Sequence, residues 1–218
     1  MNFILDLPKD MDKYLKKKRI YFALKRGTDI VLSLLALIIL LPFFFIIAVA
    51  IKLDSRGKVI FSQPRTGKNG KTFVMYKFRS MYYGAEKKQK DLLHQNEMDG
   101  PVFKISNDPR ITRVGRFIRS YSLDELPQLI NILRGDMSIV GPRPLAVYET
   151  MKFTQEENKR HLVKPGLTCY WQTRGRSQLT FQELIYLDLK YITKMNLFTD
   201  LKLILLTLKT VVMKKGAY

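Results

Sequence analysis

The stretch Ile30-Val-Leu-Ser-Leu-Leu-Ala-Leu-Ile-Ile-Leu-Leu-Pro42-Phe-Phe-Phe-Ile-Ile-Ala-Val-Ala-Ile51 decides how this chain is arranged. It carries no charge, and only Ser33 and Pro42 interrupt its apolar character. An uncharged run of this length is typical of a helix embedded in a membrane. It is not a signal peptide, because the basic region before it is too long and no small-residue cleavage site follows. The sequence therefore predicts a membrane-bound chain.

Pro42 leaves the topology of this run open. It separates residues 30–41 from residues 43–51, and a proline inside a helix kinks or breaks the helix. At about 1.5 Å per residue the two parts reach roughly 18 and 14 Å, each short of a hydrocarbon core of about 30 Å. Both flanks are basic, so charge gives no orientation. The run either spans the membrane, since membrane helices tolerate proline, or enters one leaflet, bends at Pro42 and returns.

The amino-acid composition limits the kinds of molecule that this chain can be expected to bind. The 38 Lys and Arg residues against 19 Asp and Glu give a net charge of +19, which indicates an anionic partner: nucleic acid, an anionic membrane or a phosphorylated substrate. In residues 1–28 apolar positions interleave with cations, as in a helix on a membrane surface. The single Cys169 excludes an internal disulfide, and two histidines are too few for a His/Cys zinc site. A catalytic metal would need carboxylate ligands.

A hairpin and a group of cations follow the apolar run. Residues 59–63 and 72–78 read as strands, joined by a turn at Asn69-Gly70. Lys77 and Arg79 share one side of the second strand, where they either reach a phosphate or form a solvated face. Residues 84–98 predict a polar surface helix. Arginines then recur at every third position, a spacing that drifts around a helix, so that only some would face one ligand: Arg110, Arg113, Arg116 and Arg119.

The segment Ser122-Leu-Asp-Glu-Leu-Pro-Gln128 places two acids side by side among these cations. Nearby positive charge favours the ionised form of Asp124 and Glu125, and their oxygens suit Mg²⁺ and a phosphorylated substrate. Ser122 and Glu125 also fit a capping box at the start of a helix, and a helix that begins at Pro127 is a further possibility. In each case an apolar face follows, and Gly135 ends the helix.

Three later segments complete the pattern. Residues 137–140 predict a short buried strand, which leads into Gly141-Pro-Arg-Pro144, a rigid turn that either presents Arg143 to a phosphate or is only structural. Lys164-Pro-Gly-Leu-Thr168 is a similar loop. The aromatic residues after it and Arg174 either stack on a nucleobase and hold phosphates or anchor the chain at the membrane interface. Residues 201–213 predict an amphipathic helix on the domain or on the membrane.

Together these motifs resemble the bacterial sugar transferase family, the polyprenyl-phosphate sugar-1-phosphate transferases that are also called monotopic phosphoglycosyl transferases. Five motifs in order carry the resemblance, which extends from Lys25 to Lys202: Phe61-x-Gln-x-Arg-x-Gly67, Tyr76-Lys-Phe-Arg-Ser-Met81, Ser122-Leu-Asp-Glu-Leu-Pro-Gln128, Gly135-Asp-Met-Ser-x-Val-Gly-Pro-Arg-Pro144 and Lys164-Pro-Gly-Leu-Thr168. The alternative outside this family is a non-catalytic basic protein that binds anionic lipid or nucleic acid at a membrane surface.

The resemblance implies a mainly helical α+β fold, with a small β-hairpin and amphipathic interfacial helices around an Asp-Glu active site. It divides the chain into a basic interfacial segment (1–28), a re-entrant membrane helix (29–52) bent at Pro42, and a catalytic domain (53–218) on the cytoplasmic face of the bacterial membrane. We expect this chain to be the minimal catalytic unit of the family. The family bends its helix at a Ser-Pro pair, where this chain has Leu41-Pro42.

The resemblance also implies a reaction. A sugar phosphate passes from a UDP-sugar to undecaprenyl phosphate through a covalent intermediate on Asp124, UMP is released, and exopolysaccharide, capsule or another glycoconjugate begins. Glu125 assists, Mg²⁺ binds with Asp124 among its ligands, and downstream glycosyltransferases are the expected partners, with no role for nucleic acid. The implied phosphate ligands are Lys77, Arg79, Arg119 and Arg143. The implied nucleotide or lipid loop comprises Lys164, Gly166, Thr168, Gln172, Arg174 and Asp188, the role of Asp188 being open.

One loop departs from the family pattern. Where members commonly read Gly-Trp-Ala-Gln, this chain reads Cys169-Tyr-Trp-Gln172. The aromatic residue differs in identity and position, so the detail of this loop is particular to the chain. The Asp-Glu pair is unaffected.

Overall fold

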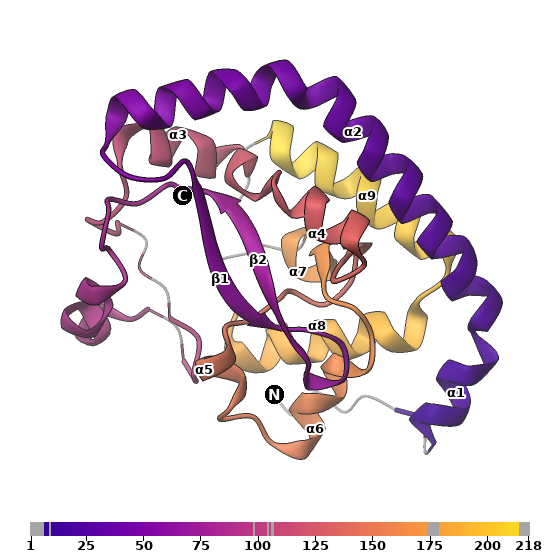
Figure 1. Ribbon diagram of the computed structural model, residues 1–218. Helices are drawn as coiled ribbons and strands as arrows, with labels where there is room; N and C mark the ends of the chain where they lie inside the picture. The colour runs from indigo at the N-terminus through magenta and orange to yellow at the C-terminus, as the bar shows by residue number, and fades with distance from the viewer. Residues whose placement is uncertain are drawn as a thin grey trace.

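The computed structural model describes residues 7–8, 10–97, 99–103, 105, 107–173 and 179–213. Its long helices are α2, α8 and α9, with shorter ones between them, and its strands form two small sheets (Figure 1). The helices are α1 Met11–Lys17, α2 Arg19–Asp54, α3 Arg113–Ser120, α4 Gln128–Arg134, α5 Val147–Thr150, α6 Gln155–Asn158, α7 Tyr170–Thr173, α8 Phe181–Lys194 and α9 Leu197–Val212. The strands are β1 Ile60–Thr66, β2 Thr72–Phe78, β3 Ser138–Val140 and β4 Gly166–Thr168. The mainly helical α+β fold is confirmed.

Helix α2 is one continuous helix of 36 residues that passes through Pro42. Figure 1 shows it as a curved arch over α3, α4 and α9. Pro42 therefore does not end the helix, because neighbouring turns keep their own hydrogen bonds. By length and composition it is the one helix among the described residues that could cross a membrane, and its apolar window is mostly unburied. Leu41 and Phe45, for example, are 67% and 73% exposed.

The N-terminal part of α2 is fastened to the domain by polar contacts. Arg26 donates to the carbonyl oxygens of Ile132 and Leu133, at the last turn of α4, the second at 2.7 Å from Nη2. A guanidinium suits this position because the last carbonyls of a helix lack partners within it. Asp29, which is buried, accepts from the backbone amide of Ile139 in β3 at 2.9 Å. The helix is thus bonded to both elements that follow the acid pair.

The C-terminal end of α2 is held by Arg79, which follows β2. The Arg79 guanidinium donates to the carbonyl oxygens of Arg56 at 2.8 Å and Ser55 at 2.6 Å. Asp54, in the last turn of α2, accepts from the amide of Val114 in α3 at 3.0 Å. Burial lowers the pKa of Arg79, and the Asp54 carboxylate opposes this effect. These contacts engage Arg79 with a helix end, and Arg79 also lines the cavity that contains Asp124. Its role as a phosphate ligand stays a prediction.

Strands β1, β2 and β3 match the predicted strands, whereas β4 lies in the segment 164–168 that was predicted to be a loop. β1 and β2 pair antiparallel from Ile60↔Phe78 to Thr66↔Thr72, and the turn between them has Asn69 at φ 55° and Gly70 at φ 74°. This left-handed backbone is the reason that Asn-Gly is favoured there. β3 and β4 pair parallel. A Cβ on Gly166, the first residue of β4, would lie 2.0 Å from the amide nitrogen of Gly141, the residue after β3. The backbone at the end of β3 therefore packs directly against the backbone at the start of β4.

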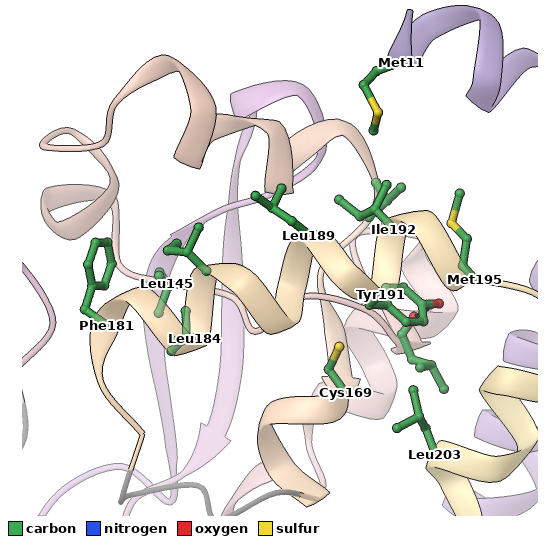
Figure 2. Packing of buried hydrophobic residues seen from close by; sticks show 13 residues of the cluster. Met11, Leu145, Cys169, Phe181, Leu184, Leu189, Tyr191, Ile192, Met195 and Leu203 are labelled. Carbon is green, nitrogen blue, oxygen red and sulfur yellow. Dashed lines mark hydrogen bonds between the residues drawn. The ribbon is translucent and has the colours of Figure 1, made fainter. Parts of the chain in front are cut away.

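The largest core cluster surrounds α8. Figure 2 shows Leu184, Leu189 and Ile192 of α8 among residues from other segments, including Met11 of α1. Tyr21 of α2 donates to Asp200 of α9 at 2.9 Å. Residues of the first thirty therefore help to build the domain core, and the basic segment predicted for 1–28 is more than a surface helix in its described part. Residues 1–6 and 9 lie outside the described residues.

Candidate active site

The acid pair stands on a tight turn between α3 and α4. Residues Leu123–Glu125 form a 3₁₀ turn, and Ser122 before it has a left-handed backbone, at φ 56°. Ser122 makes no side-chain cap, so the capping-box interpretation is wrong. α4 begins just after Pro127, close to the other start considered, and Gly135 ends it at φ 89° as predicted. A serine in the left-handed region is uncommon, and such positions often lie at functional sites.

Glu125 is held by two cations. Its Oε1 lies 2.9 Å from Nζ of Lys77 in β2 and 3.5 Å from Nη1 of Arg143. The Arg143 guanidinium also stacks on the ring of Trp171, 4.3 Å from its centroid. Stacking and ion pairing together fix the plane of this guanidinium, because each restricts a different face or edge of it. Glu125 is thereby oriented from both sides.

Asp124 has a different environment from its neighbour. It is 7% exposed and lines the main cleft, and no ion pair to its carboxylate is found among the described residues. Burial raises the pKa of Asp124, and Glu125 raises it further, whereas Lys77, Arg119 and Arg143 lower it. The carboxylate is thus unengaged and faces a cavity with three cations in electrostatic range.

The third cation, Arg119, is positioned by the residue after Arg79. Arg119 is in the last turn of α3, and its Nε donates to Oγ of Ser80 at 2.8 Å. The carbonyl oxygen of Ser80 accepts from Thr112 at 3.1 Å, at the N-cap of the same helix. Ser80 therefore joins α3 to the end of β2. Lys77, Arg119 and Arg143 come from three separate elements and meet around one acid pair.

The cleft beside the acids has a volume of about 740 Å³. This is within the usual range of small-molecule sites, about 300–1,000 Å³. Its walls come from the β1–β2 hairpin, the segment 79–89, α7, and the residues Phe103, Ile105, Asp108, Arg110 and Ile111. Apolar and aromatic side chains such as Phe61, Tyr82 and Phe103 alternate there with polar ones. The cleft can hold a phosphorylated ligand of nucleotide size with one end on Asp124.

Asp188, whose role was open, supports the Arg143 loop. It is fully buried in α8 and pairs with Arg160, whose Nε lies 2.9 Å from its Oδ2. Arg160 also donates to the carbonyl oxygen of Arg143 at 2.6 Å. Burial raises the pKa of Asp188, and Arg160 opposes this effect. The pair fixes the backbone that presents Arg143, so Asp188 acts at a distance from the cleft.

The remaining loop residues separate into two groups. Gly166 and Gln172 line cavities next to Glu125. Lys164 instead lies beside Gly135 and Arg26, and burial followed by the Arg26 charge lowers its pKa. The Thr168 hydroxyl is hydrogen-bonded to that of Thr207 in α9. Lys164 and Thr168 are therefore not brought to the acid pair, while Arg174 lies outside the described residues.

Arg65 is a cleft residue that the sequence reasoning did not assign to the site. It donates to Gln63 at 2.7 Å and lies 3.7 Å from Glu149. Burial lowers its pKa, and it lines both cavities next to Glu125. The available signal was the spacing of Gln63 and Arg65, two polar residues on one face of a strand.

The donor groups present fit a magnesium ion bound together with a substrate. Among the described residues there is no cluster of three or more His, Cys, Asp or Glu side chains that could hold a metal. Two adjacent carboxylates remain, Asp124 and Glu125. Mg²⁺ commonly binds through one or two carboxylates plus water and substrate phosphates. This acid pair meets that requirement only with a phosphorylated ligand in the cleft.

Known proteins are similar to this chain over most of its length. The family described as "Bacterial sugar transferase" matches residues 20–214. The galactosyl transferase CpsE of Streptococcus agalactiae serotype III is 46% identical over 88% of this chain and 43% of its own length. The undecaprenyl-phosphate galactose phosphotransferase of Salmonella typhimurium is 41% identical over 89% of this chain and 42% of its own. The exopolysaccharide production protein ExoY of Rhizobium meliloti is 35% identical, over 89% of this chain and 88% of its own. The chain thus spans about two fifths of the first two relatives.

Proposed function

The chain belongs to the bacterial sugar transferase family, and from this premise we propose that it transfers a sugar 1-phosphate from a UDP-sugar to undecaprenyl phosphate. The observation that carries the proposal is the Asp124 carboxylate, which forms no ion pair with the described residues and lines a cleft of nucleotide size between Lys77, Arg119 and Arg143. The product is a lipid-linked sugar diphosphate. Glycosyltransferases that extend it, and the lipids around α2, are the expected partners.

The first step is an attack by Asp124 on the donor. A carboxylate oxygen of Asp124 bonds to the phosphorus that bears the sugar, and the bond from this phosphorus to the bridging oxygen breaks. UMP leaves with that electron pair, and the sugar phosphate stays on Asp124 as an acyl phosphate. Lys77, Arg119 and Arg143 stabilise the negative charge that develops on the phosphate oxygens. Covalent catalysis of this kind divides one displacement into two.

The second step transfers the sugar phosphate to the lipid. A phosphate oxygen of undecaprenyl phosphate attacks the same phosphorus, the bond to Asp124 breaks, and the carboxylate is regenerated. Glu125 is the candidate base for a proton on the incoming phosphate. Its ion pairs with Lys77 and Arg143 hold its carboxylate in place beside Asp124.

Asp124 and Glu125 would hold a magnesium ion jointly with donor phosphate oxygens. When bound, this ion would neutralise part of the negative charge of the donor pyrophosphate.

The membrane arrangement belongs to the same proposal. Both ends of α2 bond to one domain, through Arg26 and Asp29 at one end and Arg79 at the other. A helix that crossed the bilayer would carry its two flanks to opposite sides. We therefore assign a re-entrant helix with the domain on the cytoplasmic face, where UDP-sugars are available.

The test measures UMP release by the full chain in nanodiscs, with undecaprenyl phosphate, Mg²⁺ and a panel of UDP-sugars that begins with UDP-galactose. We expect Asp124→Asn to abolish release and to abolish the phosphosugar adduct seen by intact-protein mass spectrometry without the lipid. The matched control is Asp91→Asn, an exposed acid on the surface.

Full turnover in Asp124→Asn would contradict the nucleophile assignment. A wild-type chain that binds anionic vesicles but releases no UMP from any donor would instead support the non-catalytic alternative.

A further inference from the structure

Two buried polar atoms next to Arg143 have no hydrogen-bond partner among the described residues. They are the indole nitrogen Nε1 of Trp171 and the amide oxygen Oε1 of Gln172. The Gln172 side chain is held in one orientation, because its Nε2 donates to the carbonyl oxygen of Leu167 at 3.0 Å. This contact needs the nitrogen on that side, so the oxygen is the free acceptor. Native proteins rarely leave such groups unpaired unless a ligand or water completes them.

Both atoms belong to α7, a single short helix at the edge of the cleft. Trp171 and Gln172 line the cleft together with Asp124 and Glu125, and the Trp171 ring lies against Arg143 at 4.3 Å. Gln172 is only 4% exposed, so water reaches it poorly. One donor and one acceptor are thus offered next to the cation that is paired with Glu125.

We propose that Trp171 and Gln172 form the subsite that recognises a hydroxyl group of the donor sugar. The indole N–H donates to a sugar oxygen, and the amide oxygen accepts a hydroxyl hydrogen. A sugar hydroxyl can be the partner of either atom, because it both donates and accepts. The inference rests on the function proposed above, since it places a hexose phosphate on Asp124.

The position of Trp171 and Gln172 favours the donor sugar, rather than the nucleobase, as the group that they bind. Arg143 is paired with Glu125, the neighbour of the acid that attacks the sugar-bearing phosphorus, and Trp171 is stacked on Arg143. The hexose is joined directly to that phosphate, whereas the uracil is separated from it by a second phosphate and a ribose. The polyprenyl chain of the acceptor carries no hydroxyl. The occupant nearest to this pair is therefore the hexose.

The experiment pairs each side chain with each sugar hydroxyl. The full chain in nanodiscs is assayed for kcat/KM of UMP release with the UDP-hexose that it uses best and with the deoxy analogues of that donor. The variants are Trp171→Phe, which keeps a ring against Arg143 but lacks the N–H, and Gln172→Met, which is similar in size but lacks the acceptor. Thr173→Val is the control, because it removes a polar atom from the same helix, bonded only within it.

We expect one deoxy analogue to be used at least on the order of 10²-fold less well than the parent donor by the wild-type chain, since a site built for a hydroxyl rejects its absence. In Trp171→Phe and Gln172→Met the parent donor should fall by a comparable factor, and that analogue should show little further loss. Thr173→Val should keep the wild-type discrimination.

Three results would overturn the inference. A uniform fall with all donors would mean that the residues only position Arg143. A dependence on the base, seen with an N3-methyluracil donor instead of a deoxy sugar, would assign the pair to the nucleotide. Unchanged kinetics in Gln172→Met would mean that the Gln172 amide oxygen binds a water molecule instead of the sugar. The site for this water would be the small cavity of about 10 Å³ that Gln172 and Arg65 line. The proposed function fails separately, if the wild-type chain releases no UMP from any donor.

Discussion

Two neighbouring carboxylates in this chain have unlike surroundings. Glu125 is fixed by an ion pair of 2.9 Å to Lys77, whereas Asp124 is buried, lines the cleft and forms no ion pair within the part of the chain that the structure describes. The 3₁₀ turn and the left-handed backbone of Ser122 produce this difference, because they direct the two adjacent side chains into different surroundings. An acid that must attack phosphorus benefits from having no competing ion pair, and an acid that handles a proton benefits from being oriented.

The pKa of Asp124 predicts a pH dependence. Burial raises this pKa, and Asp124 must be ionised to attack, so the acid limb of kcat/KM should lie above the pKa of a free aspartate, about 3.9. Lys77 lowers the pKa more than any other charge. In Lys77→Met the limb should move to still higher pH, besides any fall in the maximum rate. The measurement is UMP release across pH, with exposed Lys88→Met as control. An unmoved limb would show that the charge of Lys77 does not act on Asp124.

At the scale of elements, arginine side chains form hydrogen bonds with the backbone carbonyls at the ends of two helices. Arg26 bonds the last turn of α4, and Arg79 bonds the residues at the end of α2. Each guanidinium offers several donors in a fixed fork, which a lysine does not. The orphan carbonyls of both helices are thereby satisfied by residues far away in sequence.

Arg79→Lys should reduce stability and spare the chemistry. A lysine cannot reach all the carbonyl oxygens at once, and lost hydrogen bonds of a charged donor cost about 1.5–3 kcal/mol each. We expect a loss of about 2–4 kcal/mol in the free energy of unfolding, with kcat/KM per folded molecule near that of the wild type. Exposed Arg113→Lys serves as the control. Unchanged stability with a large fall in kcat/KM would support the phosphate-binding role expected from the sequence.

The same contacts explain what the sequence predicted and what it missed. The hairpin, the stop at Gly135 and the strand after it depend on local chemistry, and the structure has all three. The expected roles of Arg79 and Thr168 depended on the residues near them in sequence. Their hydrogen-bond partners in the structure are the carbonyls ending α2 and the hydroxyl of Thr207, which no local pattern reveals. The Ser122 cap failed because a left-handed backbone there excludes the extended geometry that a cap requires.

At the scale of the whole molecule, α2 runs along the domain instead of away from it. Its inner face carries the buried residues Asp29 and Ser33 towards one end and Ile47 and Ile51 towards the other, and its outer face is apolar and exposed. α9 also exposes apolar residues, among them Leu205 and Leu208. The domain and its membrane helix are therefore one packed unit.

The topology proposal predicts that both flanks of α2 lie on one side of the membrane. Single cysteines placed at Asp10→Cys and Asn69→Cys, both exposed positions, should react with an impermeant maleimide only when the cytoplasmic face is accessible. Cys169 is buried and should not interfere. The measurement compares inside-out vesicles with intact spheroplasts. Labelling of the two positions from opposite faces would rule out a re-entrant helix.

The bonds of Arg26 and Asp29 also bear on how this enzyme could be handled or redesigned. Cutting the chain after residue 52 would strip the last carbonyls of α4 and the amide of Ile139 of their partners, and would uncover the apolar cluster around Met75 and Ile132. A soluble fragment, or a graft onto a foreign anchor, would thus lose part of its own interior. We therefore expect few substitutions to be tolerated at Arg26 and Asp29, because the helix that carries the apolar run also supplies hydrogen bonds to α4 and β3.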